Sequence, residues 1–167
     1  MNSLTSAVGA IITDDAGRVL LCQQSQGHRL WGLPGGKVRD AESPIQAVIR
    51  DIREETGMET ELSELVGMYQ LTGDGCGTAL PDVLVYVFRG QLLGAEPAVN
   101  TPRISRLAWF EPDDLPRPLT ATTRTAIADA RAGVAGALRH VLRDEEPSVP
   151  DADDADIAVP VRAAALA

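Results

Sequence analysis

The sequence has little cysteine, few aromatic residues and no long hydrophobic run. Its two cysteines, Cys22 and Cys76, are too few for a disulfide framework or a zinc cluster, and we expect both to be free thiols. No stretch is apolar over enough residues to cross a membrane, and the N-terminus lacks a cationic region followed by an apolar run. These absences predict a cytoplasmic protein without a membrane partner.

The negative charge of the chain is concentrated at its C-terminal end. Residues 144–167 carry −6 of the net charge of −9, and the first 143 residues carry the other −3. This end is rich in proline, alanine and aspartate without periodicity, which is typical of a solvated extension, although its apolar residues 156–167 could dock on the domain or on a neighbour. We therefore predict one globular domain over residues 1–143 and an acidic tail over residues 144–167.

Short β runs alternate with turns along this domain, and two segments have helical signals. The segments DDAGR and TGDGCGTALPD supply the glycine and aspartate that turns and loops favour. The expected strands cover residues 7–13, 18–24, 64–71, 83–90 and 106–111, and a helix covers residues 121–133. Strands interleaved with two helices predict an α+β fold in which a mixed β-sheet is sandwiched between helices.

The other helix has clear start and stop signals. Ser43 followed by Pro44 and Gln46 is typical of a capped first turn, and Gly57 can adopt the left-handed conformation that ends a helix. Apolar residues at offsets of three, four and seven predict one buried stripe, formed by Ile45, Val48, Ile49 and Ile52. We therefore expect this helix to pack against the sheet.

Acidic residues gather on the flank of that stripe. Asp51, Glu54 and Glu55 fall within one arc of the helix, where like charges cost about 0.2–0.5 kcal/mol per pair. Arg50 can relieve part of this repulsion, and a solvated charged face is the simpler interpretation of an acidic helix. The spacing instead favours a binding site for a hard divalent cation, and Glu42 could be a further ligand.

The same segment resembles the signature of the Nudix (MutT-like) hydrolases. That signature is a glycine, five residues, a glutamate, seven residues, and then Arg-Glu-aliphatic-x-Glu-Glu-x-Gly-aliphatic. Here it runs from Gly36 through Glu42 to residues 50–58, and the one departure is Asp51, where the family has glutamate. The flanking segments RLWGLPGG and LAWFEPDDLP are also similar to Nudix domains, so the resemblance covers residues 5 to about 131.

The resemblance implies the Nudix fold and a metal-dependent reaction. Water would attack phosphorus in a nucleoside diphosphate linked to another moiety, with Mg²⁺ or Mn²⁺ inverting the repulsion between carboxylates and phosphate. A nucleoside triphosphate and a nucleotide sugar both stay open as substrates. The alternatives are a catalytically weak or inactive Nudix-fold nucleotide-binding module and an isopentenyl diphosphate isomerase. Because an acidic tail repels phosphate, no nucleic acid partner is expected, while a homodimer is possible.

The resemblance also assigns roles by position. The residues in the positions of metal ligands are Gly35, through its carbonyl, Glu42, Asp51, Glu54 and Glu55. Arg50 stands where the family has the residue that orients a glutamate, and it completes a catalytic set with Asp51 and Glu54. Glu42 could bind a further metal or buttress the helix. Asp51 could act as the general base, as a ligand or through a water, or the base could lie elsewhere.

A second departure concerns the loop before the last strand. Many relatives have an additional glutamate there, whereas this chain has Arg103, which could grip a phosphate bidentately. Glu96, Glu111 and Asp82 are the candidates for the missing carboxylate.

The expected substrate contacts flank the glycine turn before the helix and are Arg29, Trp31, Lys37 and Arg39. Trp31 could stack on a base or pack in the core. Arg29 could touch phosphate or ribose, or simply be exposed. Trp109 and Phe110 are expected to pack in the core.

Overall fold

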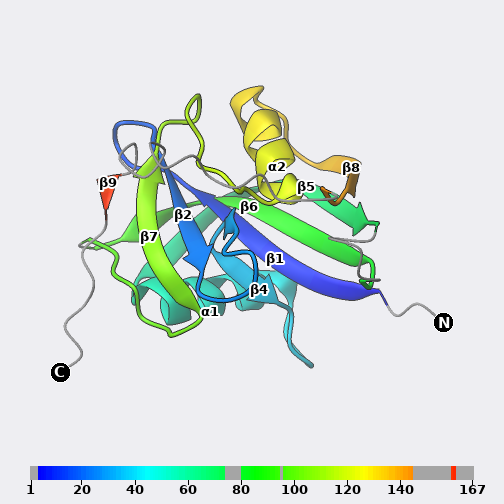
Figure 1. Cartoon of the computed structure of the whole chain (residues 1–167), viewed down its shortest axis with the longest axis horizontal. Helices are drawn as coiled ribbons and strands as arrows, with labels where there is room; N and C mark the ends of the chain where they lie inside the picture. The colour runs from blue at the N-terminus through cyan, green and yellow to red at the C-terminus, as the bar shows by residue number, and fades with distance from the viewer. Residues whose placement is uncertain (1–3, 74–79, 95, 145–158, 161–167) are drawn as a thin grey trace.

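Two β-sheets lie between two helices in the computed structural model of the chain (Figure 1). The structure describes residues 4–73, 80–94, 96–144 and 159–160. The prediction of an α+β fold with a mixed sheet between helices is confirmed. The elements in chain order are β1 (Thr5–Ile12), β2 (Val19–Gln24), β3 (Trp31–Gly32), β4 (Gly35–Lys37), α1 (Pro44–Thr56), β5 (Glu59–Thr72), β6 (Val83–Leu93), β7 (Ile104–Phe110), α2 (Ala121–Arg131), β8 (Ala137–Leu142) and β9 (Val159–Pro160).

The larger sheet is mixed and the smaller one is antiparallel. Five strands run in the order β4-β1-β6-β5-β8, with β1 parallel to β6 and β5 parallel to β8. The other sheet has the order β3-β2-β7-β9. The short strands β3 and β4 and the edge strand β8 lack a periodic pattern in the sequence, which is why they escaped prediction.

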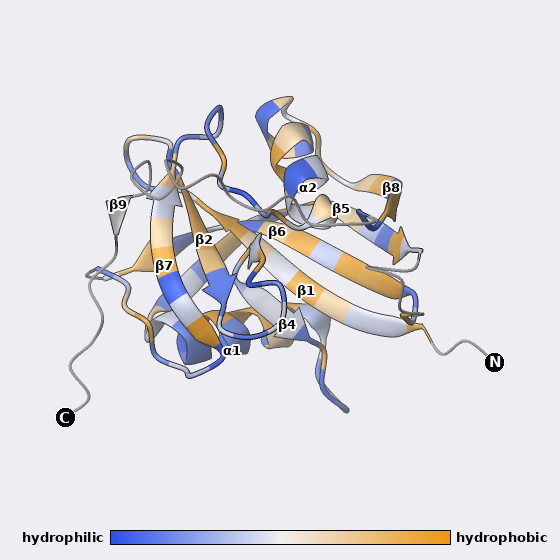
Figure 2. Cartoon of the chain, viewed as in Figure 1, coloured by the Kyte–Doolittle hydropathy of each residue, from blue (hydrophilic) through white to orange (hydrophobic). Residues whose placement is uncertain are grey.

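Both faces of the strands are covered, so neighbouring residues enter different cores. In β2, Leu20 belongs to the hydrophobic cluster that contains Val48 of α1, whereas Leu21 belongs to the cluster that contains Ile127 of α2. Side chains alternate along a strand, and burial on both faces gives a continuous apolar run instead of an alternating one. Figure 2 shows this in β1 and β2, which are largely hydrophobic between more polar loops.

The predicted ends of α1 are confirmed. Ser43 caps the helix and forms a reciprocal capping box with Gln46, Pro44 is the first helical residue, and Gly57 ends the helix with φ 72°. These contacts satisfy backbone groups that the first and last turns would otherwise leave without partners. The boundaries of the segment that carries the acidic residues are therefore set locally.

The predicted buried stripe of α1 is partly wrong. Val48 and Ile52 are fully buried, but Ile45 is 54% exposed. The buried arc is rotated toward the acidic flank, and it includes Asp51 and Glu55. Aliphatic spacing alone did not reveal this rotation, because two carboxylates occupy positions that would normally be apolar.

Several other expectations have a clear outcome. Trp109 and Phe110 pack in the core, as predicted, at 8% and 1% exposure, and Cys22 is a free, buried thiol. Cys76 and most of the acidic tail lie outside the described residues, although Val159 and Pro160 pair with β7. Within the part of the chain that is described, neither helix is long and apolar enough to span a membrane.

Candidate active site

Glu55 is held beneath the glycine turn that precedes α1. It is only 4% exposed, and its Oε2 accepts hydrogen bonds from the Gly35 N–H at 3.0 Å and from the Cys22 thiol at 3.8 Å. Burial raises the pKa of Glu55 to about 8. A Cβ on Gly35 would lie 2.1 Å from the carbonyl oxygen of Val8, so only glycine allows β4 to approach β1 and present its amide to Glu55.

Asp51 is buried one turn earlier with one oxygen unsatisfied. Its Oδ1 accepts a hydrogen bond from Arg50 Nη1 at 2.8 Å, but its Oδ2 has no partner. Burial raises the pKa of Asp51 above its ordinary value, against the opposing effect of the Arg50 charge. A Cβ on Gly36 would come within 3.0 Å of Oδ2, so this glycine keeps space beside the carboxylate. A buried, unpaired carboxylate oxygen is costly unless a ligand uses it.

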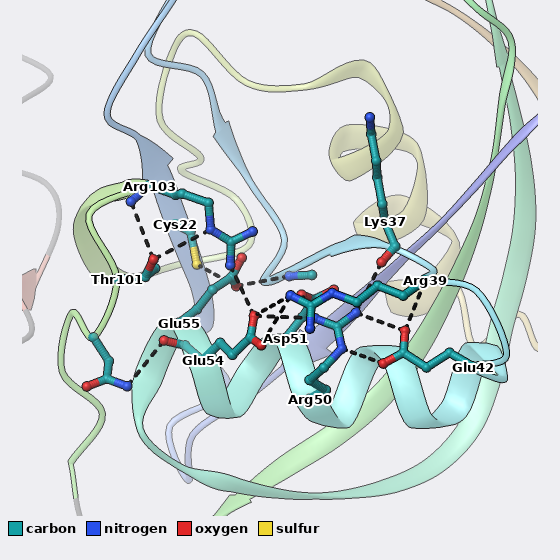
Figure 3. A network of polar contacts seen from close by, with 12 residues as sticks. Cys22, Lys37, Arg39, Glu42, Arg50, Asp51, Glu54, Glu55, Thr101 and Arg103 are labelled. Carbon is teal, nitrogen blue, oxygen red and sulfur yellow. Dashed lines mark hydrogen bonds and ion pairs between the residues drawn. The ribbon is translucent and has the colours of Figure 1, made fainter.

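Arg50 joins the carboxylates to one another, as Figure 3 shows. Its Nε and Nη2 donate to both oxygens of Glu42, and its Nη1 donates to Asp51 and, at 3.3 Å, to Glu54. Nη2 also reaches the carbonyl oxygen of Lys37 at 3.2 Å. This placement suits the orienting role that the sequence predicts for Arg50.

Glu42 is fully engaged in the structure. Besides Arg50, its Oε2 accepts a hydrogen bond from the backbone N–H of Arg39 at 2.9 Å. The hydrogen bonds from Arg50, followed by that from Arg39, lower the pKa of Glu42 to about 2. Of the two roles open to Glu42, this arrangement favours the one that buttresses the helix, because both oxygens tie the turn to Arg50.

Glu54 is surrounded by three guanidinium groups. Arg39, Arg50 and Arg103 each place a nitrogen 3.3 Å from one of its carboxylate oxygens. The repulsion expected among the acidic residues is thus offset here by arginine. Arg39 and Arg103 are more than half exposed, while Arg50 is 18% exposed. Two of these three ion pairs can therefore exchange readily with solvent ligands.

The donor set fits a hard divalent cation, although the side chains are not gathered around one. Among the residues that the structure describes, no three histidine, cysteine or acidic side chains form a group that could hold a metal ion as placed. The chemistry nevertheless suits such an ion, because the acidic groups offer only oxygen and Asp51 Oδ2 lacks a partner. Glu54 would have to exchange one of its arginines for the ion.

A cavity of about 440 Å³ opens beside Glu55. Its walls come from the end of β2, the turn between β3 and β4, and the loop before β7. The lining residues are Cys22, Gln24, Ser25, Gln26, Gly32, Leu33, Gly35, Glu55, Pro102, Arg103 and Ile104. Most of them belong to no motif, so sequence reasoning missed them. None of Glu96, Glu111 and Asp82, the candidates for the missing carboxylate, is in this lining.

Trp31 lies in the core and not in the cavity. Its exposure is 4%, and its ring meets that of Phe110 edge-on at a centroid distance of 5.0 Å. The guanidinium of Arg106 lies 5.4 Å from the centroid of the Trp31 ring. Of the two roles left open for Trp31, this position favours core packing over stacking on a base.

The three predicted cationic contacts differ in position. The Lys37 side chain points away from the acidic residues (Figure 3), and Arg29 is exposed in the turn before β3 with φ 52°. Neither lines the cavity. Arg39 does reach the acidic residues, through Glu54. Only Arg39 of these three is thus brought to the predicted metal ligands.

Comparisons with known proteins agree on one family. The family model of the NUDIX domain matches residues 3–130. A CTP pyrophosphohydrolase of Escherichia coli (strain K12) is 35% identical over 114 residues, which are 66% of this chain and 78% of the relative. A MutT-like protein of Streptomyces ambofaciens is 28% identical over 134 residues, or 80% of each chain. The crystal structure of a MutT NUDIX hydrolase from Burkholderia pseudomallei superposes with a TM-score of 0.68 at 35% identity, covering 76% of this chain and 98% of that one.

Proposed function

The chain belongs to the Nudix family of pyrophosphohydrolases, and we propose that it hydrolyses a nucleoside diphosphate linked to another moiety, with Mg²⁺ or Mn²⁺ as cofactor. The comparisons confirm the family and the enzyme class that the sequence predicted. The family generally uses divalent metal ions. The observation that carries the proposal is that α1 buries two carboxylates one turn apart, Glu55, which lines the cavity, and Asp51, which has one oxygen without a partner.

The proposed metal ligands are Asp51, Glu54, Glu55 and the carbonyl of Gly35. A divalent ion held there would neutralise phosphate charge and lower the pKa of an attacking water. Arg50 keeps Asp51 and Glu54 on one side of the helix, and Glu42 keeps Arg50 in place.

Asp51 is also our candidate for the general base. Its Oδ2 has no hydrogen-bond donor and can take a proton from the attacking water. Its side chain is one methylene shorter than the glutamate of the family, so the proton acceptor sits closer to the helix axis. Asp51 is the residue whose role most needs a test.

Two substrate classes are proposed, a nucleoside triphosphate and a nucleotide sugar. The nucleoside would enter the cavity, where Gln24, Ser25 and Gln26 offer hydrogen-bonding groups in place of an aromatic ring. Lys37 and Arg39 stay predictions as substrate contacts, and a homodimer stays a prediction as well.

The test is a hydrolysis assay over nucleoside triphosphates, nucleotide sugars, ADP-ribose and dinucleoside polyphosphates with Mg²⁺ or Mn²⁺, with products identified by mass spectrometry. We expect a nucleoside monophosphate product from one substrate class. Glu55→Gln should lower kcat by about 10²- to 10⁴-fold, because it removes a buried ligand charge. Glu61→Gln, on the exposed side of β5, is the control.

Two outcomes would count against the proposal. Full turnover by Glu55→Gln, with an unchanged circular dichroism spectrum, would remove Glu55 from the metal site. Nucleotide binding without hydrolysis of any substrate in the panel would instead support the alternative, a nucleotide-binding module that has lost the reaction.

A further inference from the structure

Arg103 stands where the acidic residues meet the cavity. Its Nη2 lies 3.3 Å from Glu54 Oε2, and it lines the cavity together with Cys22 and Glu55. Figure 3 shows its side chain extending from the loop before β7 toward Glu54. Arg103 therefore touches a proposed metal ligand and the proposed nucleoside site at once.

The backbone of Arg103 is held by hydrogen bonds, whereas its side chain is exposed and makes only long contacts. Its carbonyl oxygen accepts a hydrogen bond from the N–H of Ser25 at 3.0 Å, and the neighbouring carbonyl of Pro102 accepts one from Ser25 Oγ at 2.7 Å. The Arg103 side chain is 57% exposed, and its other contact is a long one of 3.5 Å to Thr101 Oγ1. The guanidinium is therefore positioned by two weak contacts, the pair with Glu54 and the long contact with Thr101.

The other two arginines at Glu54 are placed differently. Arg50 is 18% exposed and also binds Glu42, Asp51 and a backbone carbonyl, so it is committed to the fold of the turn. Arg39 is as exposed as Arg103 but does not line the cavity. Among the described residues, Arg103 is the one arginine that contacts Glu54 and also faces the space where a substrate would lie.

We propose that Arg103 is a substrate-phosphate-binding residue that Glu54 releases when Glu54 turns to a divalent cation. This inference rests on the proposed function, because it takes Glu54 as a metal ligand. Glu54 cannot pair with Arg103 at full strength and also bind the ion. Arg103 lines the cavity, and its released guanidinium presents parallel N–H donors, which match two phosphate oxygens.

Replacing Arg103 should have an effect that replacing a purely structural arginine would not have. Without Arg103, Glu54 loses a competitor, so the free protein should bind metal more tightly. A phosphate ligand loses a charge-assisted partner, so its binding should weaken. The two affinities therefore change in opposite directions, whereas damage to the fold of the site would weaken both.

The experiment uses the full chain with Arg103→Ala, Arg103→Lys and Arg53→Ala. One titration measures the Kd of Mn²⁺ alone by electron paramagnetic resonance. The other measures, by calorimetry at saturating Mn²⁺, the Kd of methylenediphosphonate, a diphosphate that cannot be hydrolysed. Arg53 is the matched control, since it is 56% exposed and pairs with Glu59, a carboxylate outside the site.

For Arg103→Ala we expect the Mn²⁺ Kd to fall about two- to fivefold, as for the loss of an exposed ion pair. The methylenediphosphonate Kd should rise about 10- to 100-fold, as for the loss of charge-assisted hydrogen bonds. Arg103→Lys should lie between, because lysine keeps the charge without the planar fork. Arg53→Ala should change neither value.

Three results would overturn the inference. The Kd of methylenediphosphonate could be unchanged in Arg103→Ala, or the wild type could fail to bind methylenediphosphonate. Arg103→Ala could also bind both Mn²⁺ and methylenediphosphonate more weakly than the wild type. The hydrolysis panel, run in parallel, separates this failure from that of the proposed function. If the wild type hydrolyses a substrate but the methylenediphosphonate Kd is unchanged in Arg103→Ala, only the proposed role of Arg103 is wrong. If methylenediphosphonate binding depends on Arg103 but no substrate is hydrolysed, only the catalytic proposal is wrong.

Discussion

Two buried aspartates, one on each helix, have opposite environments. Asp129 of α2 is 8% exposed and accepts hydrogen bonds from Tyr69 Oη at 2.9 Å and from two nitrogens of Arg139 at 3.0 and 2.7 Å. Arg139, and then Tyr69, hold the pKa of Asp129 below its ordinary value. Asp51 of α1 is 1% exposed, has one oxygen without a partner, and has a pKa that burial raises.

This difference separates a carboxylate whose oxygens are all hydrogen-bonded from one that has an oxygen without a partner. A buried charge with complete hydrogen bonding is stable in the folded state, whereas a buried oxygen without a donor costs free energy in the absence of a ligand. The same residue type therefore serves structure beside α2 and, in our proposal, chemistry beside α1. Substitutions at the two aspartates should affect different measurements.

The largest effect is expected for Asp51. Asp51→Asn should lower kcat/KM for the best substrate of the panel by about 10²- to 10³-fold, because it removes a proton acceptor and a ligand charge. Asp51→Glu should preserve or raise the rate, since glutamate is the residue of the family signature. Steady-state kinetics measure both. Equal rates for the wild type and the two variants would exclude Asp51 from the mechanism.

The next largest effect is expected in stability, at Asp129. Asp129→Ala should lower the free energy of unfolding by about 2–3 kcal/mol, because Tyr69 and Arg139 lose a charged, buried partner. Urea denaturation measures this value, and kcat per folded molecule should not change. Asp113→Ala is the matched control, since Asp113 pairs with Arg131 at 2.7 Å but is 81% exposed, and it should cost less than about 1 kcal/mol. Equal losses in the two variants would contradict a special role for the buried pair.

The smallest effect is a dependence on pH. Because the pKa of Asp129 is lower in the folded protein than in the unfolded chain, the unfolded chain binds more protons in acid. The stabilisation is complete above the unfolded pKa of about 3.9 and is lost as the pH falls through the folded value. Tyr69 and Arg139, the groups that face Asp129, do not titrate in this range, since the pKa of each is raised.

We therefore expect the stability difference between the wild type and Asp129→Asn to be constant from pH 8 to about pH 5 and to shrink below about pH 4. Urea denaturation at each pH measures it. Taking the difference cancels the titration of the other carboxylates, such as Glu42. A difference that grows in acid would show that the pKa of Asp129 is raised and not lowered.

Much of the site was predictable from sequence because its parts are close along the chain. The capping box at Ser43, the end at Gly57 and the spacing from Glu42 to Glu55 all lie on one helix and its flanking turn. Local backbone geometry sets which of these residues share a face. The family and the enzyme class followed from the same segment, while the α+β fold followed from the strands and helices along the whole domain.

Contacts between distant segments could not be predicted in this way. Arg103 and Glu54 are 49 residues apart, and the sequence showed only that arginine replaces an expected glutamate. The cavity combines β2 with the loop before β7, and neither carries a motif. The sequence left base stacking and core packing both open for Trp31, and the structure places its ring against Phe110. Such neighbours depend on how the sheets pack.

The sequence by itself determined the helix that carries the acidic residues, its limits, and the family to which the chain belongs. The tertiary structure decided which face of that helix is buried, leaving Ile45 exposed and placing Asp51 and Glu55 inside. The physical reason is that residue spacing fixes where side chains lie around the axis of α1. The side of α1 that faces the core depends instead on the packing of the whole domain. The close contact of Gly35 with β1 and the bonds of Arg50 hold two carboxylates where apolar residues would otherwise be favoured.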